Sequence, residues 1–332
     1  MRAVGIILAG GNNNRMKELT HKRAVAAMPI AGSYRSIDFA LSNMTNSHIQ
    51  KVAVLTQYNA RSLNEHLNSS KWWNFGRKQG GLYVFTPTIT NDNGYWYRGT
   101  ADAIYQNMDF LKKSHEPYVV IASGDAVYKM DYGKVLQYHI DKKADVTVVC
   151  KEMDPSDDVS RFGTIRMDDD MRITEFEEKP MVTKSNMIST GIYVIRRRLL
   201  IDLIEHAAEE ERFDFVNDVL IRYKNLKKIY GYKIDHYWSN IATVDAYYKT
   251  NMDFLKPEVR NYFFKQDPEI YSKVSDLPPA KYNPGASVKN SLFSMKFISN
   301  SVFSSATRQF HRPHTLPSFA YRFRLLPFRS NL

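Results

Sequence analysis

Short apolar runs alternate with helix-like segments through the first 200 residues. Four runs rich in Val, Ile and Leu have the length of buried strands: residues 4–10, 51–58, 117–125 and 144–152. Between them, residues 34–47 and 99–114 have the apolar spacing of helices. This alternation predicts an α/β fold with a doubly wound, mainly parallel sheet. Ligands are then expected at the carboxyl ends of the strands.

The pattern changes twice further along the chain. Residues 161–180 alternate apolar and polar positions around the turn Met167–Met171, which predicts a hairpin. Periodicity then breaks after Leu255, where Pro257 and Pro268 follow. The predicted segments are a first domain, a linker, the start of a β-solenoid and a basic tail without fixed structure, at 1–255, 256–285, 286–305 and 306–332.

Composition indicates a globular protein of the cytoplasm. The chain has 332 residues, of which 43% are hydrophobic, so it can bury a large core. Cys150 is the single cysteine, which excludes an intrachain disulfide and fits a reducing compartment. The sequence shows neither a signal-like start nor an apolar stretch of the roughly 20 residues that a membrane span needs.

The net charge of +11 comes largely from one end of the chain. Residues 306–332 contain five arginines and no acid, so the rest carries +6 (11 minus 5). That remainder has no basic stripe and no RNA-binding signature, which argues against a nucleic-acid partner. It does suit anionic phosphate ligands.

The loop after the first predicted strand has the pattern of a phosphate cradle. Gly10 and Gly11 leave backbone N–H groups free to face an anion, and Arg15 adds a positive charge. The three positions from Asn12 to Asn14 are asparagine, where such a loop usually has more glycine. A tight turn without a ligand is the alternative interpretation of the glycine pair.

Four stretches together resemble the ADP-glucose pyrophosphorylase (glucose-1-phosphate adenylyltransferase) family. They are LAGG…RM…LT…RA…P…YR.IDF.LSN (8–43), WYRGTADAIYQN (96–107), GDAVYKMDY (124–132) and FEEKP with STGIYV (176–194). The resemblance covers residues 1 to about 305. It implies a Rossmann-like nucleotidyltransferase domain followed by a left-handed parallel β-helix. A complete β-helix needs more chain than remains, so the C-terminus is expected to be truncated.

The family joins ATP and glucose 1-phosphate into ADP-glucose and pyrophosphate, and the resemblance assigns roles by position. Asp125 corresponds to a Mg²⁺ ligand, although a helix N-cap is the alternative interpretation, and Arg15 corresponds to the residue at the departing pyrophosphate. The implied nucleotide contacts are Leu8, Ala9, Gly10, Gly11, Tyr97 and Gly124. The implied sugar-phosphate contacts are Glu178, Lys179 and Ser189.

Several charged groups of the family pattern are absent from this sequence. Val25 stands where the family has a phosphate-binding lysine, and Asn240 where it has the second metal-binding aspartate. Asn217 also replaces a lysine, and Asn13 and Asn14 replace loop residues that include glycine. Each lost charge-assisted contact is worth about 1.5–3 kcal/mol. Mg²⁺ binding is therefore expected to be weakened.

Because these losses concentrate on one phosphate site, the sequence resembles the D-type regulatory subunit of bacterial glycogen synthesis. The expected partner is a catalytic subunit, with ATP and glucose 1-phosphate as possible ligands. A weakly active adenylyltransferase in its own right is the alternative. A basic nucleic-acid-binding protein is a third, disfavoured hypothesis.

Overall fold

A computed structural model gives the structure, and it describes residues 2–11, 14–76, 80–88, 94–274, 281–282, 287–293, 298–299 and 302–308. Within these ranges, nine strands form one sheet in the order β10-β9-β11-β6-β1-β4-β5, with β8 pairing β11 and β12 pairing β8. The strands are β1 Ala3–Leu8, β4 Lys51–Leu55, β5 Gly81–Phe85, β6 Tyr118–Ser123, β8 Val146–Glu152, β9 Gly163–Met167, β10 Ile173–Glu178, β11 Met187–Arg196 and β12 Ile229–Ile234.

The centre of the sheet is parallel, as the sequence predicts. Strand β1 pairs in parallel with β4 and β6, and β4 pairs in parallel with β5. The four predicted apolar strands are β1, β4, β6 and β8, which confirms a mainly parallel α/β fold. Strand β11 runs antiparallel to β6 and β8. In this register Leu8 lies beside Leu55 and Ser123, so three strands end together at one edge.

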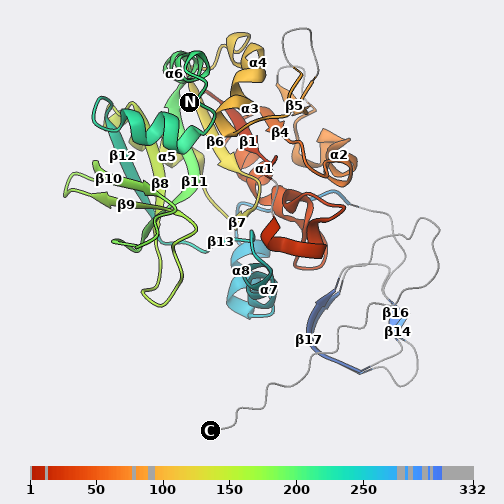
Figure 1. The fold of residues 1–332 in the computed structure, drawn as a ribbon. Coiled ribbons are helices and arrows are strands. Elements are labelled where there is room, and N and C mark those ends of the chain that lie inside the picture. The colour runs from red at the N-terminus through yellow and green to blue at the C-terminus, as the bar shows by residue number, and fades with distance from the viewer. Residues whose placement is uncertain are drawn as a thin grey trace.

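Helices cover both faces of the sheet (Figure 1). Buried residues of α1, α2 and α5 pack on one face, and those of α3, α4 and α6 on the other. These helices are α1 Ser36–Asn46, α2 Arg61–Leu67, α3 Thr100–Gln106, α4 Met108–Lys112, α5 Tyr132–Asp141 and α6 Arg197–Glu209. The segment 99–114, predicted as one helix, divides at Asn107, whose side chain donates to the Ala103 carbonyl.

The remaining elements surround the sheet edge at which the strands end. The predicted hairpin is β9 and β10, paired antiparallel. A π-helical turn spans Phe215–Ile221, and its N-cap Asp214 accepts from the Asn217 N–H. Short strands β7 Ala126–Tyr128 and β13 Trp238–Asn240 pair with each other, as do β2 Pro29–Ile30 and β3 Tyr34–Arg35. Helix α7 is Val244–Asp253.

The segment predicted as a linker from residue 256 begins instead with helix α8, Pro257–Phe264. Pro257 does not stop this helix because it occupies the first turn, where its missing N–H has no intrahelical partner. Phe263 is fully buried beside Phe254. The first packed unit therefore extends beyond the predicted boundary at Leu255.

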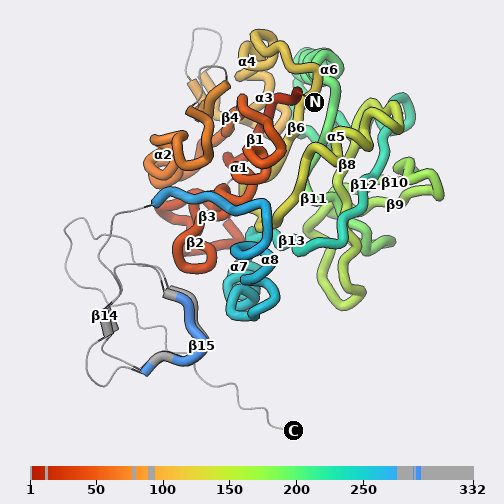
Figure 2. Tube along the Cα trace, turned by 180° about the vertical axis from the view of Figure 1, so that it is seen from behind, coloured from red at the N-terminus to blue at the C-terminus, as the bar shows by residue number. Residues whose placement is uncertain are grey.

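The chain after α8 also packs against the first domain, along α1 (Figure 2). The Tyr271 N–H donates to Ser42 Oγ at 2.8 Å, and Trp73 Nε1 donates to the Tyr271 carbonyl at 3.2 Å. Lys273 Nζ reaches the Glu65 carbonyl at 2.9 Å. These bonds fix the segment through Lys273.

Beyond it, the described pieces are two short parallel pairs. Strand β14 (Lys281–Tyr282) pairs with β16 (Ile298–Ser299), and β15 (Ser287–Phe293) pairs with β17 (Val302–Arg308). A left-handed β-helix stays a prediction, and most of the predicted tail, 309–332, lies outside the described residues. Across the described ranges, no helix has the length and apolar character that crossing a bilayer requires.

Candidate active site

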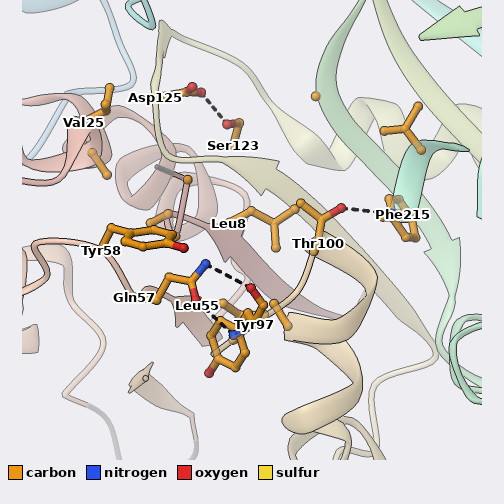
Figure 3. A pocket seen from close by; sticks show the side chains of 18 of the residues that line it. Leu8, Val25, Leu55, Gln57, Tyr58, Tyr97, Thr100, Ser123, Asp125 and Phe215 are labelled. Carbon is orange, nitrogen blue, oxygen red and sulfur yellow. Dashed lines mark hydrogen bonds between the residues drawn. The ribbon is translucent and has the colours of Figure 1, made fainter. Parts of the chain in front are cut away.

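A cavity of about 480 Å³ opens where β1, β4 and β6 end (Figure 3). Leu8, Leu55 and Ser123 come from these strand ends. The other lining residues come from the loops that follow and from more distant segments: Ala9, Gly10, Gly11, Val25, Ala26, Gln57, Tyr58, Tyr97, Arg98, Gly99, Thr100, Ala103, Asp125, Gly191, Tyr193, Phe215 and Val216. The cavity thus lies where an open α/β sheet binds ligands.

The glycine loop lines this cavity, as predicted. A side chain at Gly10 would meet Gln57 Cγ at 3.3 Å, whereas Gly11 has open space around it. Ala9 fixes the loop by donating its N–H to the Leu55 carbonyl at 2.8 Å. Gly11 therefore offers its backbone to the cavity without obstruction. The prediction for Asn13 lies outside the described residues, and Asn14 begins the turn Asn14–Thr20, which carries Arg15.

Val25 occupies the predicted lysine position and is buried rather than merely uncharged. Its side chain is 7% exposed and belongs to an apolar cluster with Met16, Met28 and Val127. The same residue lines the cavity on the side of Asp125 (Figure 3). This wall of the cavity is therefore apolar where the family pattern has an ammonium.

Tyr97 is held on the opposite side by Gln57, a residue that the motif analysis missed. The Gln57 amide donates to the Tyr97 carbonyl at 3.3 Å and accepts from its N–H at 3.0 Å. Asn107 Nδ2 donates to the Tyr97 hydroxyl at 2.9 Å, and burial raises the pKa of that phenol. Next to it, Trp96 stacks on Tyr58 with ring centroids 5.5 Å apart. The only sequence signal for Gln57 is its place directly after a strand end.

Asp125 and Asn240 are brought together from distant parts of the chain, as the two metal positions require. Strand β7 pairs antiparallel with β13, which places Asn240 opposite Ala126. The Ile241 N–H also donates to the Asp125 carbonyl at 2.9 Å. The preceding Gly124 packs tightly, because a side chain there would approach Ala26 Cβ to 3.2 Å.

The side-chain oxygens at both positions already have partners within the protein. Ser123 Oγ donates a short hydrogen bond to Asp125 Oδ1. Asn240 Oδ1 accepts from the Ala242 N–H at 3.0 Å, so the amide oxygen closes its own turn. Among the described residues, no group of three or more His, Cys, Asp or Glu side chains could hold a metal. This donor set does not fit a magnesium ion held by two protein carboxylates.

Glu178, Lys179 and Ser189 do not line the cavity itself. Glu178 ends β10 and forms an ion pair with Lys179 at 2.8 Å. Ser189 is buried, and its hydroxyl lies 3.2 Å from the hydroxyl of Tyr193, which does line the cavity. Burial raises the pKa of the Tyr193 phenol. Of these three residues, Ser189 is thus connected to the cavity through one side chain, and the sugar-phosphate roles stay predictions.

Comparison with known proteins decides the family. The "Nucleotidyl transferase" family model matches residues 4–257. A glucose-1-phosphate adenylyltransferase of Thermosipho melanesiensis is 39% identical over 293 residues, covering 88% of this chain and 71% of that protein. The enzyme of the same name from Clostridium novyi is 40% identical over 292 residues, covering 87% and 76%. The chain belongs to the glucose-1-phosphate adenylyltransferase family.

A solved structure supports the fold of this adenylyltransferase family member. A Bacillus anthracis protein assigned as a glucose-1-phosphate thymidylyltransferase superposes with a TM-score of 0.61 at 21% identity. The match covers 76% of this chain and 94% of that one. At this identity the likeness establishes the nucleotidyltransferase fold and leaves the substrate open.

Proposed function

We propose that this chain is a regulatory subunit of glucose-1-phosphate adenylyltransferase in glycogen synthesis, with little activity of its own. The observation that carries the proposal is how the structure uses Val25 and Asn240. Val25 is buried in an apolar cluster, and the oxygen of Asn240 is bonded to its own backbone. Neither position offers a charge to a phosphate group. Its relatives support the reaction that the proposed complex carries out.

The reaction needs charge neutralisation more than any other contribution. The phosphate oxygen of glucose 1-phosphate attacks the α-phosphorus of ATP, the bond to the β-phosphate oxygen breaks, and pyrophosphate leaves. Catalysis of such a transfer is mostly positioning and stabilisation of phosphate charge. This chain retains backbone donors at Gly11 and the Tyr97 loop for positioning. It lacks part of the charge that the chemical step requires.

The proposed partner is a catalytic subunit of the same family, and the proposed compartment is the cytoplasm. ATP and glucose 1-phosphate are ligands that the cavity can still receive. A second candidate function is weak adenylyltransferase activity of this chain alone. The observation that favours it is Asp125, whose side chain lines the cavity and whose second carboxylate oxygen, Oδ2, has no bond in the described part of the chain.

Pyrophosphate release tests the proposal. The purified chain is assayed with ATP, Mg²⁺ and glucose 1-phosphate, alone and mixed with the catalytic subunit of its organism. We expect at most a trace of turnover alone and a changed rate or substrate dependence in the mixture. Turnover of the isolated chain on the order of 10 s⁻¹, an ordinary enzyme rate, would refute the regulatory assignment. A mixture that behaves as the catalytic subunit alone would refute it equally.

A further inference from the structure

A second cavity, of about 550 Å³, adjoins the first at the β7–β13 pair. Asn240, Thr243 and Arg161 line it, and Arg161 comes from the loop between β8 and β9. Arg161 Nη1 donates to Thr243 Oγ1 at 3.1 Å. The same turn that carries Asn240 therefore holds this guanidinium, and the Ile241 N–H of that turn is bonded to the Asp125 carbonyl.

The guanidinium is fixed on a second side by an aromatic ring. The Arg161 side-chain carbon lies 4.7 Å from the centroid of the Phe162 ring, which in turn packs edge-on against Trp238 at 5.6 Å. Thr243 is itself rigid, because it caps α7 by accepting from the Ala246 N–H at 3.2 Å. Arg161 is thus half-buried and oriented before any ligand arrives.

Its positive charge has no direct ion pair among the described residues. The printed hydrogen bond of Arg161 goes to a neutral hydroxyl. Asp158 lies nearby, yet its Oδ1 accepts from the Ser160 N–H at 3.0 Å. Burial lowers the pKa of Arg161; Asp158 and Asp125 raise it, and the nearby Arg15 lowers it further. Two neighbouring arginines with guanidinium N–H groups to spare suit an anion.

We propose that Arg161, together with Arg15, binds a phosphate group of ATP or glucose 1-phosphate and replaces the divalent cation at this site. The inference deepens the proposed function and rests on it, since it concerns how a non-catalytic subunit keeps a ligand. A planar guanidinium matches two phosphate oxygens at once, and its fixed charge needs no carboxylate ligands. Asparagine at position 240 also leaves Arg161 without a carboxylate that would neutralise it.

The acids around the second cavity do not cancel this charge, because most have partners elsewhere. Glu152 pairs with Lys233 at 2.7 Å, and Asp253 pairs with Lys256 at 2.6 Å. Asp154 accepts from the backbone and hydroxyl of Ser156. The phosphate is therefore expected at the end of the cavity formed by Arg161 and Asn240, toward Asp125.

Equilibrium binding to the full chain tests this inference. ATP and glucose 1-phosphate are titrated separately, each in EDTA and in Mg²⁺. Wild-type affinity in EDTA should lie within about threefold of that in Mg²⁺. Arg161→Gln should weaken binding by roughly tenfold or more, and Arg161→Lys by less. The matched control is Arg166→Gln on β9, an exposed arginine whose partner is Glu175 at 3.5 Å, and it should bind as the wild type does. The ligand that Arg161→Gln weakens identifies the phosphate concerned.

Three results would each overturn the inference: binding that EDTA abolishes, wild-type affinity in folded Arg161→Gln, or no binding of either ligand in any buffer. Thermal unfolding of each variant establishes that it is folded. None of these outcomes alters the effect of the chain on the catalytic subunit, which tests the proposed function separately. A failure of one is therefore distinguishable from a failure of the other.

Discussion

Reversing the two altered positions should restore activity only when both are changed. The variant is Val25→Lys with Asn240→Asp, assayed by pyrophosphate release beside each single substitution. Both side chains act on the same phosphate charge, and the β7–β13 pair places Asn240 next to Asp125. Their effects should therefore be coupled rather than additive.

The structure sets the size of each effect. A lysine at position 25 can extend its ammonium into the cavity that Val25 lines, where a charge-assisted contact is worth about 1.5–3 kcal/mol, or roughly 10- to 100-fold in rate. It also removes a buried valine from the apolar cluster, which costs up to about 2 kcal/mol of stability. Asn240→Asp keeps an acceptor for the Ala242 N–H, so its turn should survive. Alone, however, it places a second carboxylate beside Asp125, and like charges oppose ionisation of both.

We expect little change from either single substitution and a gain of at least about tenfold from the pair. Val25→Met with Asn240→Asp is the matched control, because methionine has similar length and no charge. Equal activity of the methionine and lysine pairs would refute the charge argument. A folded double variant that binds ATP but stays inactive would place the defect elsewhere, with Asn12 to Asn14 as the next residues to change.

Three further predictions concern stability and domain limits. Burial lowers the pKa of His139 from an ordinary 6.5 to about 4, so only the unfolded chain gains a proton between these values. Stability should be full above about pH 6.5 and fall by roughly 3 kcal/mol toward pH 4, and urea unfolding should show most of this loss disappearing in His139→Asn. Gly99→Ala should lower the melting temperature, since its Cβ would lie 2.2 Å from the Phe213 carbonyl oxygen, whereas Gly94→Ala, with no atom within 4 Å, should not. Trypsin should leave a fragment that ends at Lys273 or later, and mass spectrometry showing a stable end at residue 256 would contradict the packing of α8.

Much of the fold could be predicted because local patterns and tertiary packing agree there. The apolar runs that become β1, β4, β6 and β8 are buried on both faces, which is what a continuous run of branched residues indicates. Prediction was wrong at residue 257, where a proline normally read as a break occupies the first turn of α8. The contacts that hold this helix come from Phe254 and other residues that sequence spacing does not reveal.

The candidate site was predictable in position but not in detail. Motif order placed Gly11, Tyr97 and Asp125 at one cavity, and the structure brings them together. It could not show that both ends of the Gln57 amide are used to hold the Tyr97 loop. Nor could it find Arg161, because an arginine before a hairpin looks like an ordinary solvated charge until its contact with Thr243 is known.

The two lost charges also differ in how completely the fold has accommodated them. At position 25 an apolar side chain completes a cluster with Met16 and Val127, so reversal has a packing cost. At position 240 the replacement is nearly isosteric, and the amide oxygen serves the same turn that a carboxylate oxygen could serve. Asn240 is therefore reversible at little structural cost, whereas Val25 is not. If this chain descends from an active enzyme, the substitution at position 25 is the one that makes a return to catalysis difficult.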